Sequence, residues 1–479
     1  MQEESLKHKT KKGLYWSFFN QFCTYGMQFV VGIVMARLLS PSDYGITALP
    51  AIFMTIATVF IESGFSSALV RKQDLSEKDL TTAFLYSIAV GFLLYGILFV
   101  SAPLIATFYE TPILTPLVRV TALSFLWAPL NTPQMVLLQR KLDFKTPARI
   151  SFINNIVAGT TGISLAYLGF GLWSLVVSGL VSSFLGFIQT WFAVRWLPRE
   201  KWSSDSFNYL WGYGNKLVLT NLINTIYGNI GAIIIGKSAG TVDLGNYNRA
   251  KNYAALPSVN ITQVLTAVSF PVLSKLQNNN ELLSYHYRRM IRVSAFIVFP
   301  IMMLLAALAR PLVLSMLTDK WEACIVLLQI LCFVFMWQPI QILNLNVLQV
   351  KGRTDLSLKL ELIKKPISIC IILIGLYFGV VGFCLADFFV SMFALCLNTY
   401  YTGKIINVGY FRQLRDIVPI LILSVAIYFF VIGVCNLIEN HLLQIAIGGL
   451  SGGGLYIILS CLFRFSELDD VKFLLKRKS

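Results

Sequence analysis

Charged residues are scarce in this chain. Only 13% of its 479 residues are Asp, Glu, Lys or Arg, whereas a soluble protein carries about 25%. Hydrophobic residues make up 56% of the chain and the mean hydropathy is +0.69. This is more apolar surface than a soluble core can bury, because even large domains keep much of their surface in water. The composition therefore excludes a soluble globular domain and predicts an integral membrane protein.

Acidic residues and metal-ligand clusters are also lacking. The 23 Asp and Glu residues face 39 Lys and Arg residues, so the net charge is +16, which in a soluble protein would indicate nucleic acid binding. The eight cysteines lie in apolar runs without a Cys-x-x-Cys pair, and the three histidines are far apart. A metal site or a bound cofactor is therefore not expected.

Apolar segments long enough to cross a bilayer, about 20 residues each, recur along the chain between short polar connectors. This pattern predicts an all-α membrane protein with about fourteen transmembrane helices. They are expected near residues 13–38, 44–62, 80–103, 113–137, 147–168, 171–194, 217–236, 250–274, 291–309, 322–347, 357–378, 380–402, 414–435 and 443–463.

Lys and Arg are distributed unevenly between alternate connectors. Of the 39 cations, 32 fall on the side that carries both termini and six fall on the other side. Because cytoplasmic connectors carry the excess of cations, both termini are predicted to lie in the cytoplasm. Three of the six outward cations, Lys237, Arg249 and Lys251, are close together between the seventh and eighth helices. Charge that breaks the rule in this way marks a candidate functional site.

A short motif recurs 200 residues apart. Arg37 precedes an Asp-x-Gly triplet that ends at Gly45, and Lys237 precedes one that ends at Gly245. Because transporters are often built from duplicated halves, we predict two six-helix bundles in pseudo-repeat plus two further helices. The predicted parts are an N-terminal bundle at 1–194, a cytoplasmic linker at 195–216, a C-terminal bundle at 217–403, and two extra helices with a basic cytoplasmic tail at 404–479.

Residues 231–238 match the phosphate-binding pattern G-x-x-x-x-G-K-[ST] letter for letter. A working P-loop follows a buried strand and opens a helix, so that successive backbone N–H groups surround a phosphate. Here the pattern ends a predicted transmembrane helix, whose N–H groups are already bonded to carbonyls. ATP binding is therefore not expected, and any transport must use another energy source.

Polar side chains within the predicted helices indicate a cavity rich in amides, aromatic rings and positive charge. In lipid, such side chains must turn toward protein or water. Amides and aromatic rings suit sugars, and cations suit phosphate. The candidate substrate-cavity residues are Gln21, Gln28, Arg119, Lys216, Asn221, Asn224, Tyr227, Arg249 and Lys251. The alternative for each amide is an ordinary interhelical hydrogen bond.

Carboxylates within the predicted helices are few. Glu62 ends the second helix, and Asp387 lies inside the twelfth without a cation near it in sequence. Burial favours the protonated form of such a carboxyl, so both residues are candidates for coupling to H⁺ or Na⁺. The alternative for Asp387 is a hydrogen bond to a neighbouring helix or a place near the aqueous edge.

Four stretches carry a family resemblance, most clearly Ala36–Gly45 and Glu62–Val70, and also Gly245–Ala250 and Thr318–Trp321. They resemble the Wzx-type polysaccharide flippases of the multidrug/oligosaccharidyl-lipid/polysaccharide superfamily, most closely the colanic-acid and teichuronic-acid exporter branch. The resemblance extends from about residue 13 to residue 403. Some relatives place a cation in the first helix, where this chain has only amides before Arg37.

The resemblance implies a transporter, not an enzyme, in the cytoplasmic (inner) membrane of a bacterium. It would flip undecaprenyl-diphosphate-linked oligosaccharide repeat units for lipopolysaccharide O-antigen, capsule or exopolysaccharide synthesis, by ion-coupled alternating access of an antiporter type. The implied partners are this lipid-linked substrate, membrane lipids, a periplasmic polymerase and a chain-length regulator, without nucleic acid.

Two other functions remain open from the sequence. A multidrug-type exporter of organic cations predicts an acidic, aromatic cavity, whereas the cluster here is cationic. A membrane polysaccharide polymerase or glycosyltransferase predicts a sizeable external loop with acid or base groups. The longest predicted external connector, Lys237–Arg249, has a single carboxylate, Asp243. A purely structural scaffold would leave the charges within the membrane unexplained.

Overall fold

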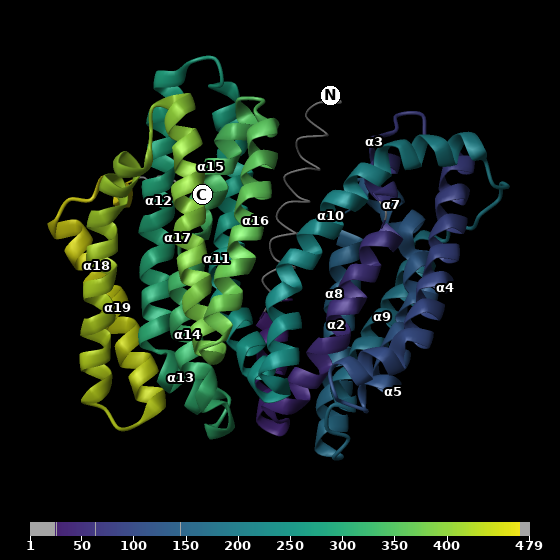
Figure 1. Cartoon of the computed structure of the whole chain (residues 1–479), viewed down its shortest axis with the longest axis horizontal. Coiled ribbons are helices and arrows are strands. Elements are labelled where there is room, and N and C mark those ends of the chain that lie inside the picture. The colour runs from purple at the N-terminus through teal and green to yellow at the C-terminus, as the bar shows by residue number, and fades with distance from the viewer. Residues whose placement is uncertain (1–23, 25, 63, 144, 470–479) are drawn as a thin grey trace. The chain divides into compact units, whose positions relative to one another are not determined.

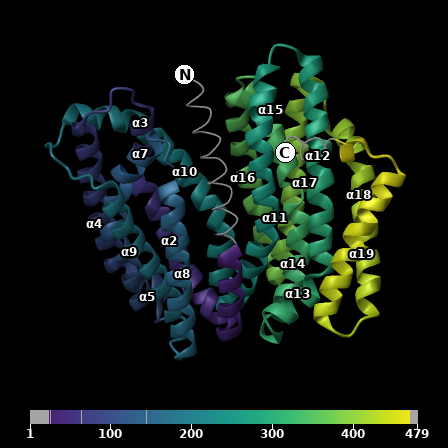
Figure 2. The ribbon, with the colours of Figure 1, turned by 180° about the vertical axis from the view of Figure 1, so that it is seen from behind.

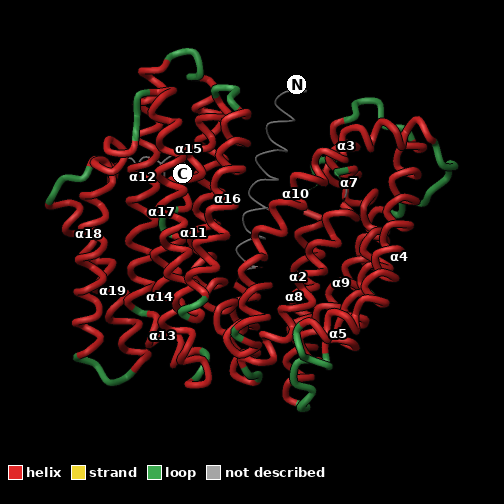
Figure 3. The backbone as a smooth tube through the Cα atoms, in the orientation of Figure 1, coloured by secondary structure: helices red, strands yellow, loops and turns green. Residues whose placement is uncertain are grey.

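The computed structural model describes residues 24, 26–62, 64–143 and 145–469, and every regular element in these ranges is a helix (Figure 3). The predicted all-α class is thereby confirmed. The chain divides into two compact units, Met1–Gly245 and Asn246–Ser479. The sequence analysis placed a cytoplasmic linker at 195–216. Helix α10 (Ser204–Ser238) occupies part of that stretch and belongs to the first unit.

The first unit contains the helices up to α10 and the start of α11 (Figure 1). Its described elements are the helix Gly26–Leu38, α2 (Pro41–Glu62), α3 (Phe65–Arg71), α4 (Glu77–Phe108), α5 (Leu114–Ala122), α6 (Ser124–Trp127), the 3₁₀ helix η1 (Ala128–Asn131), α7 (Thr132–Arg140), α8 (Lys145–Tyr167), α9 (Trp173–Val194) and α10.

The second unit contains most of α11 (Gly240–Lys275) and the helices after it (Figure 1). They are α12 (Asn280–Ala307), α13 (Ala309–Met316), the 3₁₀ helix η2 (Asp319–Trp321), α14 (Glu322–Phe335), α15 (Gln338–Val350), α16 (Thr354–Leu376), α17 (Gly379–Ile406), α18 (Tyr410–Asn436) and α19 (His441–Leu462).

Ten stretches of the described chain are long and apolar enough to cross a membrane, and they coincide with ten of the fourteen predicted segments. Of the other four segments, 147–168 and 357–378 form the helices α8 and α16. The segment 113–137 is broken into α5, α6, η1 and α7. The segment 13–38 is described only in part.

Prolines explain where two of the predicted spans break. Pro129 lies in the first turn of η1 and Pro133 in the first turn of α7. In the tenth predicted segment, Pro339 lies in the first turn of α15, directly after α14 ends. Proline has no N–H group to donate and fits the first turn of a helix but not its interior. Each break therefore starts a new helix.

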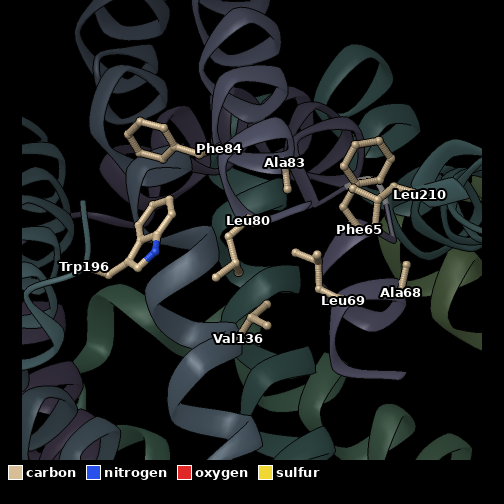
Figure 4. Close-up of a cluster of buried hydrophobic side chains, with 9 residues drawn as sticks. All are labelled: Phe65, Ala68, Leu69, Leu80, Ala83, Phe84, Val136, Trp196 and Leu210. Atoms are coloured by element: carbon tan, nitrogen blue, oxygen red, sulfur yellow. The ribbon is translucent and has the colours of Figure 1, made fainter. Parts of the chain in front are cut away.

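A buried apolar cluster joins α3, α4, α7 and α10 in the first unit (Figure 4). Phe65 of α3 is fully buried and stacks on Tyr86 with 4.5 Å between ring centroids. Trp196 packs edge-on against Phe84 of α4 at 5.6 Å, and its indole N–H donates to Glu77 Oε2 at 2.9 Å. These contacts attach the chain between α9 and α10 to the start of α4.

Helix α12 is the central helix of the second unit, with contacts to α14, α15, α17, α18 and α19. Figure 2 shows α18 and α19 side by side along α12 and α13. The predicted extra helices therefore pack closely on the second unit. Phe299 of α12 meets Trp337 edge-on at 5.1 Å, and the hydroxyl of Tyr456 in α19 donates to Phe296 O at 2.9 Å.

The two copies of the Asp-x-Gly motif meet in the first unit, where α2 and α11 begin. A Cβ atom added to Gly45 would lie 1.7 Å from the carbonyl oxygen of Thr241, and one added to Gly245 would lie 1.9 Å from that of Pro41. The hydroxyls of Ser42 and Thr241 are hydrogen-bonded at 3.1 Å. Gly45 contacts Thr241 and Gly245 contacts Pro41. Because Gly245 and Thr241 lie 200 residues after Gly45 and Pro41, the two motifs pack against each other in a nearly symmetric way.

Candidate functional site

The two cations predicted at the start of the second unit are held by aromatic rings. The guanidinium carbon of Arg249 lies 5.3 Å from the centroid of the Tyr253 ring and 5.6 Å from that of the fully buried Trp321. The Nζ atom of Lys251 lies 5.7 Å from the centroid of the Tyr247 ring. Cation–π contacts at such distances stabilise a positive charge that has lost part of its water.

The ring that faces Lys251 is itself fixed by a neighbouring helix. Tyr247 is 3% exposed and meets Phe383 of α17 edge-on, with 5.3 Å between centroids and an interplanar angle of 82°. The start of α11 is therefore packed on α17 at the level of Lys251. The sequence gives no local sign of this contact, since the two rings are far apart along the chain.

Helix α17 also brings Asp387 to Lys251. The two side chains interact electrostatically, and both have intermediate exposure. At 1.5 Å per residue, Lys251 lies about 16 Å along α11 and Asp387 about 12 Å along α17, inside two of the candidate spans. The tertiary structure thus supplies the cation that Asp387 lacks in the local sequence.

The predicted residues of the first unit occupy several different places. Arg119 of α5 donates from Nε to Phe99 O at 3.2 Å, and its guanidinium lies 4.3 Å from the Phe99 ring centroid. Gln28 donates to Asn155 Oδ1 of α8 at 3.3 Å. Asn221 and Asn224 are exposed along α10, and the neighbouring Tyr227 is half-buried.

Three other predicted residues have no described place in a cavity. Glu62 is exposed at the last residue of α2, unlike Asp387, which lies well inside its helix. Gln21 lies outside the described residues. Lys216 belongs to α10, and its side chain is likewise outside the described part of the structure.

Lys237, the third of the clustered outward cations, forms a surface ion pair. Its Nζ atom lies 2.7 Å from Glu110 Oε1, and both side chains are exposed. The hydrogen bond and the positive charge of Lys237 lower the pKa of the Glu110 carboxyl below its usual value. The charge of Lys237 is therefore paired with a carboxylate at the surface. The other two cations of this cluster, Arg249 and Lys251, lie in the second unit.

The stretch that matches the P-loop pattern is helical. Residues 231–238 form the end of α10, and the hydroxyl of Ser238 donates to the carbonyl of Ile234 in the same helix at 2.7 Å. Gly236 packs against Leu49, where an added Cβ would lie 2.5 Å from its side chain. This is the helical context that the sequence predicted, and it does not form a phosphate-binding loop.

Sequence reasoning missed the rings contributed by distant segments. Phe383 carries no local sign of a role. Trp321 had one, because it ends the Thr318–Trp321 stretch that carries the family resemblance. Its place beside Arg249 gives that stretch a physical function, since a buried indole face holds the guanidinium inside the span.

Ten described stretches that are long and apolar enough to cross a membrane, arranged in two compact helical units, define a multi-pass helical membrane protein. The chain belongs to the polysaccharide biosynthesis protein family, whose model matches residues 34–326. The resemblance to Wzx-type flippases noted in the sequence is confirmed, and so is the multi-pass location in a bacterial cytoplasmic membrane.

Two relatives and one solved structure are similar over most of their length. The teichuronic acid biosynthesis protein TuaB of Bacillus subtilis is 26% identical over 356 residues, 74% of each chain. The lipopolysaccharide biosynthesis protein WzxC of Escherichia coli is 24% identical over 421 residues, 85% of this chain and 84% of the relative. The lipid II flippase MurJ in an inward closed conformation has the same fold, with a TM-score of 0.75 and 18% identity over 93% of this chain and 98% of that one.

Proposed function

We propose that this protein flips undecaprenyl-diphosphate-linked oligosaccharide repeat units across the cytoplasmic membrane for surface polysaccharide synthesis. The observation that carries the proposal is the placement of Arg249 and Lys251 inside the α11 span, each against aromatic rings. A diphosphate cannot enter the apolar interior without cations to balance its charge. Both named relatives act in polysaccharide biosynthesis, which favours glycan export over the export of organic cations.

Different groups in the proposed site would bind the diphosphate and the sugars of the substrate. Arg249 presents a planar fork of donors that suits phosphate oxygens, and Lys251 adds a compact charge. The rings of Tyr247, Tyr253 and Trp321 hold these cations in place, so little side-chain entropy is lost when the diphosphate binds. Amides and aromatic rings elsewhere in the predicted cavity would contact the sugars.

Asp387 is the proposed ion-coupling residue. In the proposed cycle the carboxylate form of Asp387 balances the charge of Lys251, with which it interacts electrostatically. Uptake of H⁺ by Asp387 would remove this negative charge, so that Lys251 would attract an anion. Glu62 is exposed at the last residue of α2, whereas Asp387 lies inside its span, so Asp387 is favoured for coupling to H⁺ or Na⁺ during alternating access.

The proposed membrane topology has about fourteen spans, two six-helix bundles with two further helices, and both termini in the cytoplasm. The bias of 32 cations to six between alternate connectors supports this orientation. In this arrangement the protein has no catalytic step of its own. It supplies flipped repeat units to a periplasmic polymerase and its chain-length regulator.

Deletion of the gene tests the proposed function directly. Lipid-linked repeat units should accumulate on the cytoplasmic face, where an impermeant label applied from outside cannot reach them, while polymerisation of units supplied from outside continues. Accumulation on the outer face instead would contradict the proposal and indicate a polymerase. Unchanged surface glycan with increased sensitivity to cationic dyes would indicate drug export.

Substitution of the two enclosed cations tests the site. Arg249→Ala and Lys251→Ala should each lower surface glycan about tenfold or more, because an interaction of about 1.4 kcal/mol with a charged group corresponds to a factor of ten. Surface glycan is measured at equal membrane abundance of the protein. Lys237→Ala is the matched control, since its charge is paired at the surface. Normal export by both variants would remove these cations from the site.

A further inference from the structure

Helix α17 carries a stripe of polar residues that begins at Asp387. Ser391, Asn398 and Thr402 follow at spacings of four, seven and four residues, which place them on the same face of the helix. All three are buried, and Asn398 is only 1% exposed. The stripe extends about 22 Å along α17 at 1.5 Å per residue, toward the end of the helix that carries Lys404.

Neighbouring helices supply polar partners along this stripe. Gln341 of α15 donates from Nε2 to the hydroxyl of Ser391 at 2.8 Å. One turn further along α15, Asn344 exchanges two amide hydrogen bonds with Gln413 of α18, both at 3.1 Å. The fully buried hydroxyl of Tyr287 in α12 lies beside Gln413 and Thr402. Polar groups from four helices therefore face one another inside the second unit.

Several of these buried groups lack a partner within the described chain. Neither amide atom of Asn398 makes a hydrogen bond to a described residue, and neither does the indole nitrogen of Trp337. Buried polar atoms in folded proteins are almost always satisfied by protein or by ordered water. An Asn with both amide atoms unbonded thus indicates a hydrated position.

A small cavity adjoins these groups. It has a volume of about 10 Å³ and is lined by residues that include Trp337, Thr399, Tyr410 and Gln413. This is close to the space that one water molecule needs when it has polar partners. The cavity lies between α15, α17 and α18, and of the groups named above the Gln413 amide and the Trp337 indole line it.

We infer that the side chains of Ser391, Asn398, Thr402, Gln341, Gln413 and Tyr287, with the waters they bind, form a polar lane that conducts protons between Asp387 and the Lys404 end of α17. The inference rests on the proposed coupling role of Asp387. The neutral carboxyl breaks its O–H bond and gives the proton to the nearest water or hydroxyl of the lane. Successive hydrogen-bonded groups pass it to bulk water, and the carboxylate left behind is balanced by Lys251.

The charges around Asp387 are compatible with this exchange. Lys251 of α11 is the charged group that interacts with it, and Tyr247 of α11 and Cys384 of α17 are its titratable neighbours. α15 contributes neutral polar side chains to the lane and has no titratable residue. A lane of hydroxyls, amides and water can carry a proton without holding a fixed charge in the low-dielectric interior.

Charged side chains on the other neighbouring helices form ion pairs with one another. On α16, Lys364 and Lys365 lie 2.6 Å and 3.8 Å from the carboxylate oxygens of Glu361. At the contact of α12 and α18, Arg288 is paired with Asp416 at 2.6 Å. Arg288 and Asp416 neutralise each other, and Glu361 offsets the charge of one of its two lysines, so each of these carboxylates has a cation beside it.

Hydrogen exchange at Asp387 tests the lane without any glycan substrate. The full-length protein in lipid nanodiscs is taken through a pH step, and the carbonyl stretch of the protonated carboxyl is assigned by its loss in Asp387→Asn. The shift of this infrared band after transfer to D₂O then gives the exchange rate. Asn398→Leu removes a buried amide that makes no hydrogen bond to the described chain, so it should leave the fold intact.

Asn398→Leu should slow the exchange about tenfold or more, the effect of losing a hydrogen-bonding group in the path. The double variant Gln341→Leu with Ser391→Ala should do the same, because it removes both partners of one bond. Ser424→Ala is the control, since that buried hydroxyl donates to its own helix at Ile420 O. Unchanged exchange in both lane variants would overturn the inference.

The test also separates the lane from the proposed transport. Slow exchange in the lane variants supports the lane whichever glycan the protein transports, because the measurement uses no glycan. If the carboxyl band of Asp387 is absent at every pH, Asp387 does not bind a proton and the lane is overturned together with its coupling role. Loss of export in Arg249→Ala and Lys251→Ala would still support the flippase proposal in that case.

Discussion

At the scale of single residues, two absent side chains allow α2 and α11 to begin in contact. Gly45 and Gly245 sit where a Cβ atom would meet a backbone carbonyl oxygen within 2 Å, at 1.7 Å and 1.9 Å. Backbone atoms cannot move aside as a flexible side chain can. The repeated Asp-x-Gly motif therefore has a packing reason, because only glycine fits at either crossing position.

Gly45→Ala and Gly245→Ala should each destabilise the protein by about 1–3 kcal/mol, the usual cost of overpacking a well-packed contact. The measurement is the midpoint of thermal unfolding in detergent, followed by intrinsic fluorescence. Gly454→Ala serves as the control, since a Cβ atom there has no neighbour within 4 Å. Equal midpoints for all three variants would mean that the crossing of α2 and α11 is not as close as described.

The enclosed cations show a second residue-scale effect. Lys251 and Asp387 are separated by more than a hundred residues, yet each supplies the opposite charge that the other requires inside the membrane. The sequence identified both as unusual because charge in a span is costly. It could not pair them, because no local spacing relates α11 to α17.

At the scale of elements, the start of α4 is fixed by a capping box with an added ion pair. The hydroxyl of Ser76 accepts from the backbone N–H of Asp79, and the Asp79 carboxylate accepts from the backbone N–H of Ser76. Lys72 donates to both carboxylate oxygens at 2.8 Å. Asp79 is fully buried, so its charge depends on these partners.

Asp79→Ala should lower the stability of the protein by about 2 kcal/mol or more, because it removes a helix cap and leaves Lys72 without its carboxylate. Thermal unfolding in detergent measures the loss. Lys78→Ala changes an exposed charge in the same turn and is the matched control. An unfolding midpoint for Asp79→Ala equal to that of the control would show that the capping box does not stabilise the start of α4.

At the scale of the whole molecule, the last two helices are part of the second unit. Arg288 of α12 donates to both carboxylate oxygens of Asp416 in α18 at 2.6 Å. One turn further along α12, Arg292 lies 2.8 Å from Glu467, beyond the end of α19. Two arginines on one face of the central helix thus hold the segments before and after the α18–α19 pair.

A double-mutant cycle on Arg288→Ala and Asp416→Ala should give a coupling energy of about 1 kcal/mol, at the low end for a bidentate pair because Arg288 is partly exposed. The same cycle on Arg292 and Glu467 should give a larger value, since Glu467 is almost fully buried. Unfolding midpoints of the full chain in detergent provide the energies. Strictly additive effects in both cycles would contradict this attachment of α18 and α19 to α12.

Much of the fold followed from local sequence. Ten of the fourteen predicted segments coincide with apolar helices long enough to span, because each such helix satisfies its own backbone and needs only length and hydropathy. The boundary between the two compact units lies after Gly245, and α10 packs on α2, α3 and α4 of the first unit.

The sequence by itself determined the class of this protein, ten of the predicted spans, and which charges are unusual for a membrane segment. Hydropathy and charge are local quantities, and the bilayer selects directly on them. Only the tertiary structure decided that Trp321 lies beside Arg249, that Phe383 packs against the Tyr247 ring, that Asp387 interacts with Lys251, and that buried polar side chains of several helices lie along α17. These are contacts between helices, which depend on packing in three dimensions and leave no fixed spacing along the chain.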